Sequence, residues 1–192
     1  VCTPTHLAEV ARQLADGHEG LTTKVFGPKE IEKLGMGSFL SVTQGAAEPP
    51  RFIVMDYRGA GKKDAPIALC GKGVTFDTGG ISIKPSPKMD EMKFDMCGAA
   101  GVIGTMAAVA QMRPELIVVA VVPACEIMPG SAAPRPEAAL AAVCREAATR
   151  ARSAHRTHRD RHWFGNHGVP QHCQSIGSAA SQLPERGGNS LR

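Results

Sequence analysis

The chain has 192 residues, of which 43% are hydrophobic and 21% charged, an ordinary balance for a soluble protein with one core. It has no run of 18 or more apolar residues, and its first residues lack the basic and apolar regions of a secretory signal, so we expect a cytoplasmic protein without a membrane partner. Its six cysteines form no CxxC pair, which favours reduced thiols over a disulfide framework or a structural zinc-thiolate site.

The net charge of +4 is unevenly distributed along the chain. Residues 1–136 hold 14 Lys and Arg against 14 Asp and Glu, whereas residues 137–192 hold eight Arg, no Lys and four acids. A designed nucleic-acid surface would carry its excess charge on the folded domain. Nucleic acid is therefore not an expected partner.

The first quarter of the chain alternates predicted helices and strands. Apolar residues at helical spacing predict a helix over residues 5–15, ended by Gly17. Residues 22–26 are typical of a short strand, and residues 29–34, after a proline, of a helix. The segment RFIVMDY, between Pro-Pro and Gly, predicts a strand over residues 51–57.

The middle of the chain contains longer apolar segments. Residues 67–70 and 115–123 are continuous apolar runs that predict strands buried on both faces, and residues 97–112 predict a helix of small residues packed closely on a sheet. This succession predicts an α/β fold, a three-layer sandwich with a central mixed, largely parallel sheet flanked by helices.

The composition changes after Pro136. Residues 137–192 are rich in Ala, Arg, His, Ser and Gln and contain five of the seven histidines and the only tryptophan. Residues 137–152 favour a helix, and the remainder has the composition of loop or disorder. We therefore divide the chain into a domain over residues 1–136 and an atypical tail over residues 137–192, and we interpret the tail as an out-of-frame or unrelated continuation.

Four charged residues stand in the glycine-rich middle of the chain. Carboxylates are the usual ligands of divalent ions, and Asp77 follows an apolar strand in FDTGG, where open α/β sheets place their sites. Asp95 precedes the helix that starts near Cys97, so it is either a helix cap, the more common role, or a metal ligand. Lys72 and Lys84 are either surface residues or groups that act beside a cation.

Taken together, these residues carry a specific resemblance. Lys72, Asp77, Lys84 and Asp95, in GKGVTFDTGGISIKP and MKFDMCGAA, resemble the signature of the leucyl (cytosol) aminopeptidase family, at five, twelve and twenty-three residues from the first lysine. The resemblance covers about residues 1–136, through VCTPTHLAEVARQLA and ELIVVAVVPACEIMPGSAAPRP. It implies a catalytic domain of that family, which releases N-terminal residues such as leucine from peptides.

The resemblance also implies roles for single residues. Lys72 and Asp95 would bind one metal ion, Asp77 would bridge two divalent ions, Mn or Zn, and Lys84 would polarise the scissile carbonyl. Met92 would line the pocket for the side chain of the first substrate residue. A family-type hexamer is the homo-oligomer that it implies.

One part of the family pattern is not found in the sequence. A second signature, NTDAEGRL, which would supply another Asp, a bridging Glu and an Arg, is absent from the 192 residues, and Glu137 replaces an expected Gly. We therefore expect reduced metal occupancy and an incomplete site. The alternative function is that of a catalytically inactive fragment or relic with a structural or nucleic-acid-binding role.

The histidines of the tail offer a rival metal site. His155, His158 and His162 have spacings that fit one helical face, but the arginines between them repel a cation and no apolar anchor holds the segment. We expect a solvated run there. A phosphate-binding loop at Gly71–Gly73 is excluded because the pattern GxxxxGK[ST] is absent.

Overall fold

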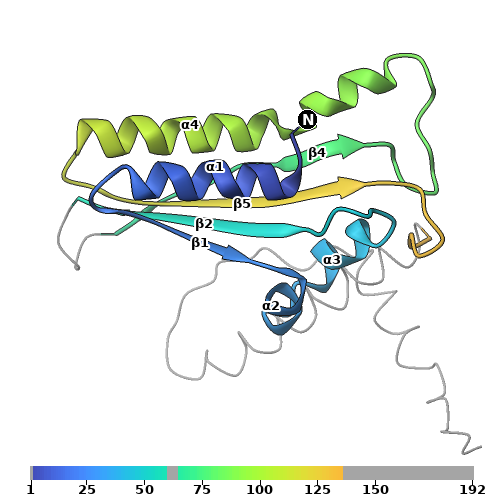
Figure 1. Cartoon of the computed structure of the whole chain (residues 1–192), viewed down its shortest axis with the longest axis horizontal. Helices are drawn as coiled ribbons and strands as arrows, with labels where there is room; N and C mark the ends of the chain where they lie inside the picture. The colour runs from blue at the N-terminus through green and yellow to red at the C-terminus, as the bar shows by residue number, and fades with distance from the viewer. Residues whose placement is uncertain (1, 60–64, 136–192) are drawn as a thin grey trace, which may run out of the picture. The chain divides into compact units, whose positions relative to one another are not determined.

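The structure is a computed structural model that describes residues 2–59 and 65–135. The predicted helix over residues 137–152, the histidine run and the boundary at Pro136 lie outside the described residues, so they stay predictions. The described part contains a five-stranded sheet with helices on its faces (Figure 1). In chain order its elements are α1 (Pro4–Asp16), β1 (Leu21–Phe26), α2 (Pro28–Lys33), α3 (Gly37–Thr43), β2 (Arg51–Arg58), β3 (Ile67–Cys70), β4 (Gly73–Asp77), the 3₁₀ helix η1 (Met89–Met96), α4 (Cys97–Met112) and β5 (Ile117–Ile127).

The sheet is mixed, as predicted. Strand β1 pairs with β2 and β2 with β5 in antiparallel fashion, whereas β3 and β4 pair with β5 in parallel. The two parallel strands follow one another along the same edge of β5: β3 lies beside Val118–Val121, and β4 beside Ala124–Ile127. Gly71 and Lys72 separate β3 from β4. Lys72 therefore lies in a gap between two strands that pair with the same edge of β5.

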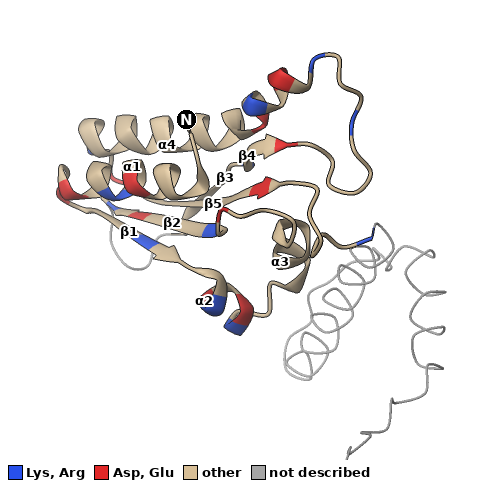
Figure 2. Cartoon of the chain, turned by 45° about the vertical axis from the view of Figure 1, so that its right-hand side comes forward, with Lys and Arg blue, Asp and Glu red and all other residues tan. Residues whose placement is uncertain are grey.

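The core lies between the sheet and the helices α1 and α4, which cover one of its faces in Figure 1. Alternate residues of β2 and β5 point to this face, as the two-residue period of a strand requires. Figures 1 and 2 show α2 and α3 on the opposite side, next to the ends of β1 and β2. The predicted α/β sandwich is therefore confirmed. The fully buried core side chains are contributed by α1 (Ala11), β2 (Ile53, Met55), α4 (Ala99, Met106) and β5 (Ala120, Val122, Ala124).

Two glycines let α4 and the parallel strands approach closely. A Cβ atom on Gly71 would lie 2.7 Å from the carbonyl oxygen of Gly98 at the start of α4, and one on Gly98 would lie 3.0 Å from the backbone nitrogen of Lys72. The N–H of Ala99 donates a hydrogen bond of 2.8 Å to the carbonyl of Lys72. The N-terminal turn of α4 is therefore attached directly to the gap between β3 and β4.

Several elements differ from the sequence-based expectation. The sequence did not indicate α3 or η1, and it placed Asp77 after an apolar strand without giving the bounds of β4; β5 runs to Ile127, beyond the predicted end at residue 123. The prediction that residues 67–70 are buried on both faces is wrong, because Ile67 is 47% exposed. Within the described residues β3 pairs with β5 alone, so no strand covers its other edge.

By length and composition alone, the helical segment Met89–Met112 is long and apolar enough to cross a membrane. Its first part is η1, a 3₁₀ helix that contains four charged residues among eight. Its second part, α4, buries Ala99, Ile103, Met106 and Ala110 against the fold. One face of α4 therefore packs on the sheet, as the sequence predicted, whereas a Cβ atom on Gly101 or Gly104 would meet nothing within 4 Å, so close packing does not explain those two glycines.

The two methionines of α4 provide a test of this packing. Met106 is fully buried and Met112 is 78% exposed in the same helix. We expect Met106→Ala to lower the free energy of unfolding by about 2–5 kcal/mol, because it leaves a cavity between helix and sheet. Met112→Ala should change it by less than about 0.5 kcal/mol. Urea denaturation of both variants measures the difference, and equal effects would contradict the packing of α4.

Candidate metal centre

The four charged residues singled out in the sequence form two lysine–carboxylate pairs. Lys72 Nζ lies 2.6 Å from the carboxylate of Asp95, and Lys84 Nζ lies 2.7 Å from Oδ2 of Asp77. Asp77 ends β4, Lys72 sits in the gap before β4, and Lys84 and Asp95 come from the segment between β4 and α4. Figure 2 shows this end of the sheet, with acidic residues at the ends of β4 and β5 and charges on the segment beyond.

Asp77 is the more enclosed of the two carboxylates. Its side chain is 13% exposed, Lys84 donates to its Oδ2, and the backbone N–H of Gly79 donates to its Oδ1 over 2.9 Å. Burial acts to raise the pKa of Asp77. These hydrogen bonds and the nearby positive charges outweigh burial and lower its pKa below the usual value. The Asp77 carboxylate is thus held in its charged form.

Asp95 belongs to η1 and does not cap α4. The residue at the cap position is Met96, and no side chain caps the helix. The cap interpretation of Asp95 is therefore wrong, because the 3₁₀ turn runs on to the residue before the helix. Lys72 donates instead to Oδ1 of Asp95 over 2.6 Å.

Both carboxylate oxygens of Asp95 lie close to the same lysine. Lys72 Nζ is 2.6 Å from Oδ1 and 2.6 Å from Oδ2. The ammonium group therefore offsets the negative charge of the carboxylate. This pair places one carboxylate and one amine side by side at the gap between β3 and β4.

Met92 lies beside the inner pair. Its sulfur is 3.2 Å from Lys84 Nζ, so the lysine is in contact with both the carboxylate of Asp77 and the thioether. The resemblance implies a substrate-side-chain pocket at Met92. Its half-buried position next to Lys84 agrees with that role.

A tight turn after β4 positions Lys84. Gly79 and Gly80 have φ values of +87° and +72°, which residues with side chains adopt only with strain. The N–H of Thr78 donates to the carbonyl of Ile127, and the N–H of Lys84 donates to the carbonyl of Thr78. The turn therefore closes residues 78–84 onto the end of β5 and brings Lys84 back to Asp77.

The donor set suits a divalent cation, although it is small. Asp77, Asp95 and a neutral Lys72 amine would supply oxygen and nitrogen donors of the kind that Mn and Zn accept. The described residues contain no group of three His, Cys, Asp or Glu side chains able to hold a metal ion. These residues thus fit part of a metal site, with further ligands needed.

Sequence reasoning did not single out Cys125, which is buried near this centre. Burial raises the pKa of its thiol to about 12, with a further contribution from the charge of Asp77. The thiol is therefore protonated at neutral pH and is a packing residue in the metal-free chain. A lone cysteine in an apolar strand gives no sequence signal for such a position.

Comparison with known proteins supports the same family. The model of the cytosol aminopeptidase family, catalytic domain, matches residues 1–146. The chain is 60% identical over 136 residues to a probable cytosol aminopeptidase of Cupriavidus pinatubonensis and 62% identical over 134 residues to one of Polaromonas naphthalenivorans. These alignments cover 71% and 70% of this chain but 26% of each relative, so the chain spans about a quarter of the length of these curated relatives.

A solved structure has a similar fold. The bottromycin maturation enzyme BotP in complex with Mn superposes with a TM-score of 0.63 at 38% sequence identity. The match covers 69% of this chain and 28% of that protein.

The Lys84–Asp77 pair predicts a titration change. We expect Lys84→Met to raise the pKa of Asp77, because burial raises this pKa and fewer positive charges would then remain to lower it. At pH 7 it should lower the free energy of unfolding by about 1–2 kcal/mol. Because the pKa of Asp77 is lowered on folding, this contribution is present above the unfolded carboxyl pKa of about 4 and is lost as the pH falls through the folded value.

NMR titration of the Asp77 carboxyl carbon, with EDTA present, measures the effect. The control is Lys88→Met, since Lys88 is 79% exposed and 3.9 Å from Glu91. An unchanged Asp77 pKa in Lys84→Met, or the same shift in Lys88→Met, would refute the electrostatic role of Lys84.

Proposed function

The chain belongs to the cytosol aminopeptidase family, and on that premise we propose that its site serves a two-metal exopeptidase that releases N-terminal amino acids of the leucine type from peptides. The observation that carries the proposal is the convergence of two lysine–carboxylate pairs, 2.6 Å and 2.7 Å long, at the ends of strands β3 and β4. Carboxylate oxygens and a lysine amine that lie together in this way are donors that a divalent ion accepts.

In this proposal Asp77 would be a ligand of both divalent ions, while Lys72 and Asp95 would hold one of them. The position of Asp95 beside Lys72 and the charged form of Asp77 support these assignments. When bound, the two ions would supply an activated water and a Lewis acid for the carbonyl. Manganese is favoured by its presence in the BotP complex, and zinc is the other candidate.

Lys84 then acts on the substrate. Its ammonium group lies at the centre of the site, 2.7 Å from Asp77 and 3.2 Å from the Met92 sulfur. A cation at this place would donate a hydrogen bond to the scissile carbonyl oxygen and stabilise the negative charge that develops there. The Met92 side chain would contact the side chain of the first substrate residue, and Asp77 holds Lys84 in position for both.

The remaining ligands are not in the 192 residues. The second family signature, NTDAEGRL, is absent from the sequence, so we propose that these residues alone bind metal weakly and turn over poorly. A catalytically inactive domain is the second candidate function, and the absent signature is the observation that favours it. The names of the relatives support a cytoplasmic location, and a hexamer is the oligomer proposed by resemblance.

Metal binding is the first test of the proposed site. In a calorimetric titration with Mn²⁺ we expect one weak site, which Asp77→Asn abolishes because it removes the enclosed carboxylate. The matched control is Asp90→Asn, an exposed carboxylate on η1, which should leave binding unchanged. Two tight sites would contradict the expected loss of ligands, and retention of binding in Asp77→Asn would refute the assignment of Asp77.

Recognition of a free amino terminus tests the exopeptidase assignment. We expect Mn²⁺ to increase the affinity of the chain for leucinamide by about tenfold, since the amine would bind beside the metal, and to leave the affinity for N-acetyl-leucinamide unchanged. Equal effects on both compounds would exclude an aminopeptidase site. Hydrolysis of leucine p-nitroanilide with Mn²⁺ or Zn²⁺ separates the two candidate functions, because clear metal-dependent turnover would refute the inactive domain.

A further inference from the structure

Thr78 is a buried polar residue directly after Asp77, and it is 6% exposed. Its hydroxyl donates a hydrogen bond of 2.8 Å to the carbonyl of Ile127 and accepts one of 3.3 Å from the N–H of Gly80. Its backbone N–H donates to the same Ile127 carbonyl over 2.9 Å, and its carbonyl accepts from the N–H of Lys84 over 2.8 Å. Thr78 therefore connects the end of β5, the turn after β4 and the backbone of Lys84.

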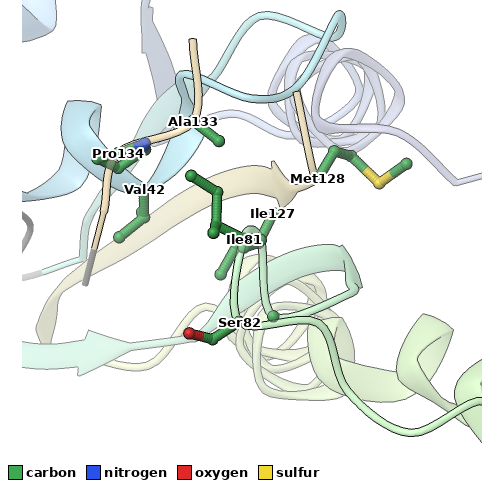
Figure 3. Close-up of a pocket in the computed structure, with 9 residues that line it drawn as sticks. Val42, Ile81, Ser82, Ile127, Met128, Ala133 and Pro134 are labelled. Carbon is green, nitrogen blue, oxygen red and sulfur yellow. The ribbon is translucent and has the colours of Figure 1, made fainter. Parts of the chain in front are cut away.

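The Thr78 hydroxyl acts where the turn meets the sheet. Figure 3 shows Ile81 of the turn beside Ile127 at the end of β5. A Cβ atom added to Gly80 would lie 3.7 Å from Cγ2 of Ile127, so the backbone of the turn lies close to that side chain. The bond from the hydroxyl to the Ile127 carbonyl thus attaches the turn to β5 at this point.

Two side-chain oxygens hold the glycine pair of the turn. Asp77 Oδ1 accepts from the N–H of Gly79 over 2.9 Å, and the Thr78 hydroxyl accepts from that of Gly80. Each oxygen accepts from the N–H two residues ahead, an arrangement that Asp and Thr side chains favour. Gly79 and Gly80 have φ values of +87° and +72°, and glycine has access to many other conformations. The hydroxyl therefore restricts the backbone that carries the N–H bound to Asp77.

Thr75 offers a comparison within the same strand. It is 4% exposed, and its hydroxyl donates to the carbonyl of Cys125 over 3.3 Å. Both threonines thus place a buried hydroxyl on a carbonyl of β5, but Thr75 lies inside β4 and Thr78 lies in the turn. A purely structural role would be the same for both residues.

We propose that Thr78 is a positioning residue of the metal site, whose hydroxyl fixes the turn that holds the Asp77 carboxylate and returns Lys84 to it. The inference rests on the proposed function and adds to it a residue that contacts neither metal nor substrate. Hydrogen bonds outside the ligand shell orient metal ligands and tune their affinity. Without the hydroxyl, the glycine pair would be free to change conformation, and the carboxylate and the ammonium group would lose their fixed geometry.

Calorimetric titration of the full 192-residue chain with Mn²⁺ tests the inference. We expect Thr78→Val, which keeps the branched shape without the hydroxyl, to weaken Mn²⁺ binding by about 10- to 100-fold. Thr78→Ser should retain the wild-type affinity, because Ser carries the same donor and acceptor group. Thr75→Val is the matched control: it also removes a buried hydroxyl from β4 and should leave the affinity unchanged.

Amide hydrogen exchange of the metal-free chain gives a second readout. The informative signal is that of Gly79, whose N–H donates to Asp77 and not to the threonine. We expect it to exchange faster in Thr78→Val and at the wild-type rate in Thr75→Val and Thr78→Ser. The methyl signal of Ile53, a fully buried core residue, reports whether each variant keeps its fold, and Thr78→Ala replaces Thr78→Val if that variant does not.

The wild-type titration separates this inference from the proposed function. If wild-type chain binds Mn²⁺ through Asp77 and a folded Thr78→Val binds it equally well, the positioning role is overturned and the proposed function stands. Equal losses of affinity in Thr75→Val and Thr78→Val, or an unchanged Gly79 exchange rate, would also overturn the positioning role. Absence of Mn²⁺ binding by the wild-type chain would overturn the proposed function, and the role of Thr78 in a metal site with it.

Discussion

The pairing of β3 and β4 in succession along one edge of β5 determines where every candidate residue lies. The gap between the two strands frees Lys72 from the ladder, and the end of β4 places Asp77 beside Ile127. The hydrogen bond from Ala99 to the Lys72 carbonyl attaches α4 to this gap, which brings Asp95, two residues before the helix, within 2.6 Å of the lysine. A shift of one residue in the register of β4 would turn Asp77 to the other face of the sheet.

The two lysines offset the cost of placing two carboxylates at one edge. Without the ammonium groups, the enclosed Asp77 would be protonated more readily, since burial favours the neutral form. The same ammonium groups would compete with a cation for the carboxylate oxygens, so under the proposed function the metal affinity would reflect the difference between two favourable interactions. Removal of one member of such a pair costs more than the pair contributes, because the other charge is left unpaired. This competition gives the lysines a role before any substrate binds.

The sequence predicted the parts of the site that depend on spacing and strand ends. Asp77 at the end of a strand, the close packing of α4 and the mixed sheet all follow from residue patterns that have a local physical cause. The role of Asp95 does not follow from such a pattern. A 3₁₀ helix that ends at Met96 and a left-handed backbone conformation at Lys88 determine where the Asp95 side chain points, and neither feature has a clear signal in the sequence. The exposure of β3 also escaped prediction, since an apolar run does not show how many neighbours a strand has.

The turn over residues 78–84 holds the Lys84–Asp77 pair together. Gly79 cannot carry a side chain, because a Cβ atom there would meet the Ser82 carbonyl oxygen at 2.4 Å, and the N–H of Gly79 donates to Asp77. The same turn returns Lys84 to Asp77. Because hydrogen bonds to Ile127 and Thr78 fix both ends of the turn, a change that loosens it would move the ammonium group away from the carboxylate. The position of the Lys84 charge is therefore determined by backbone geometry.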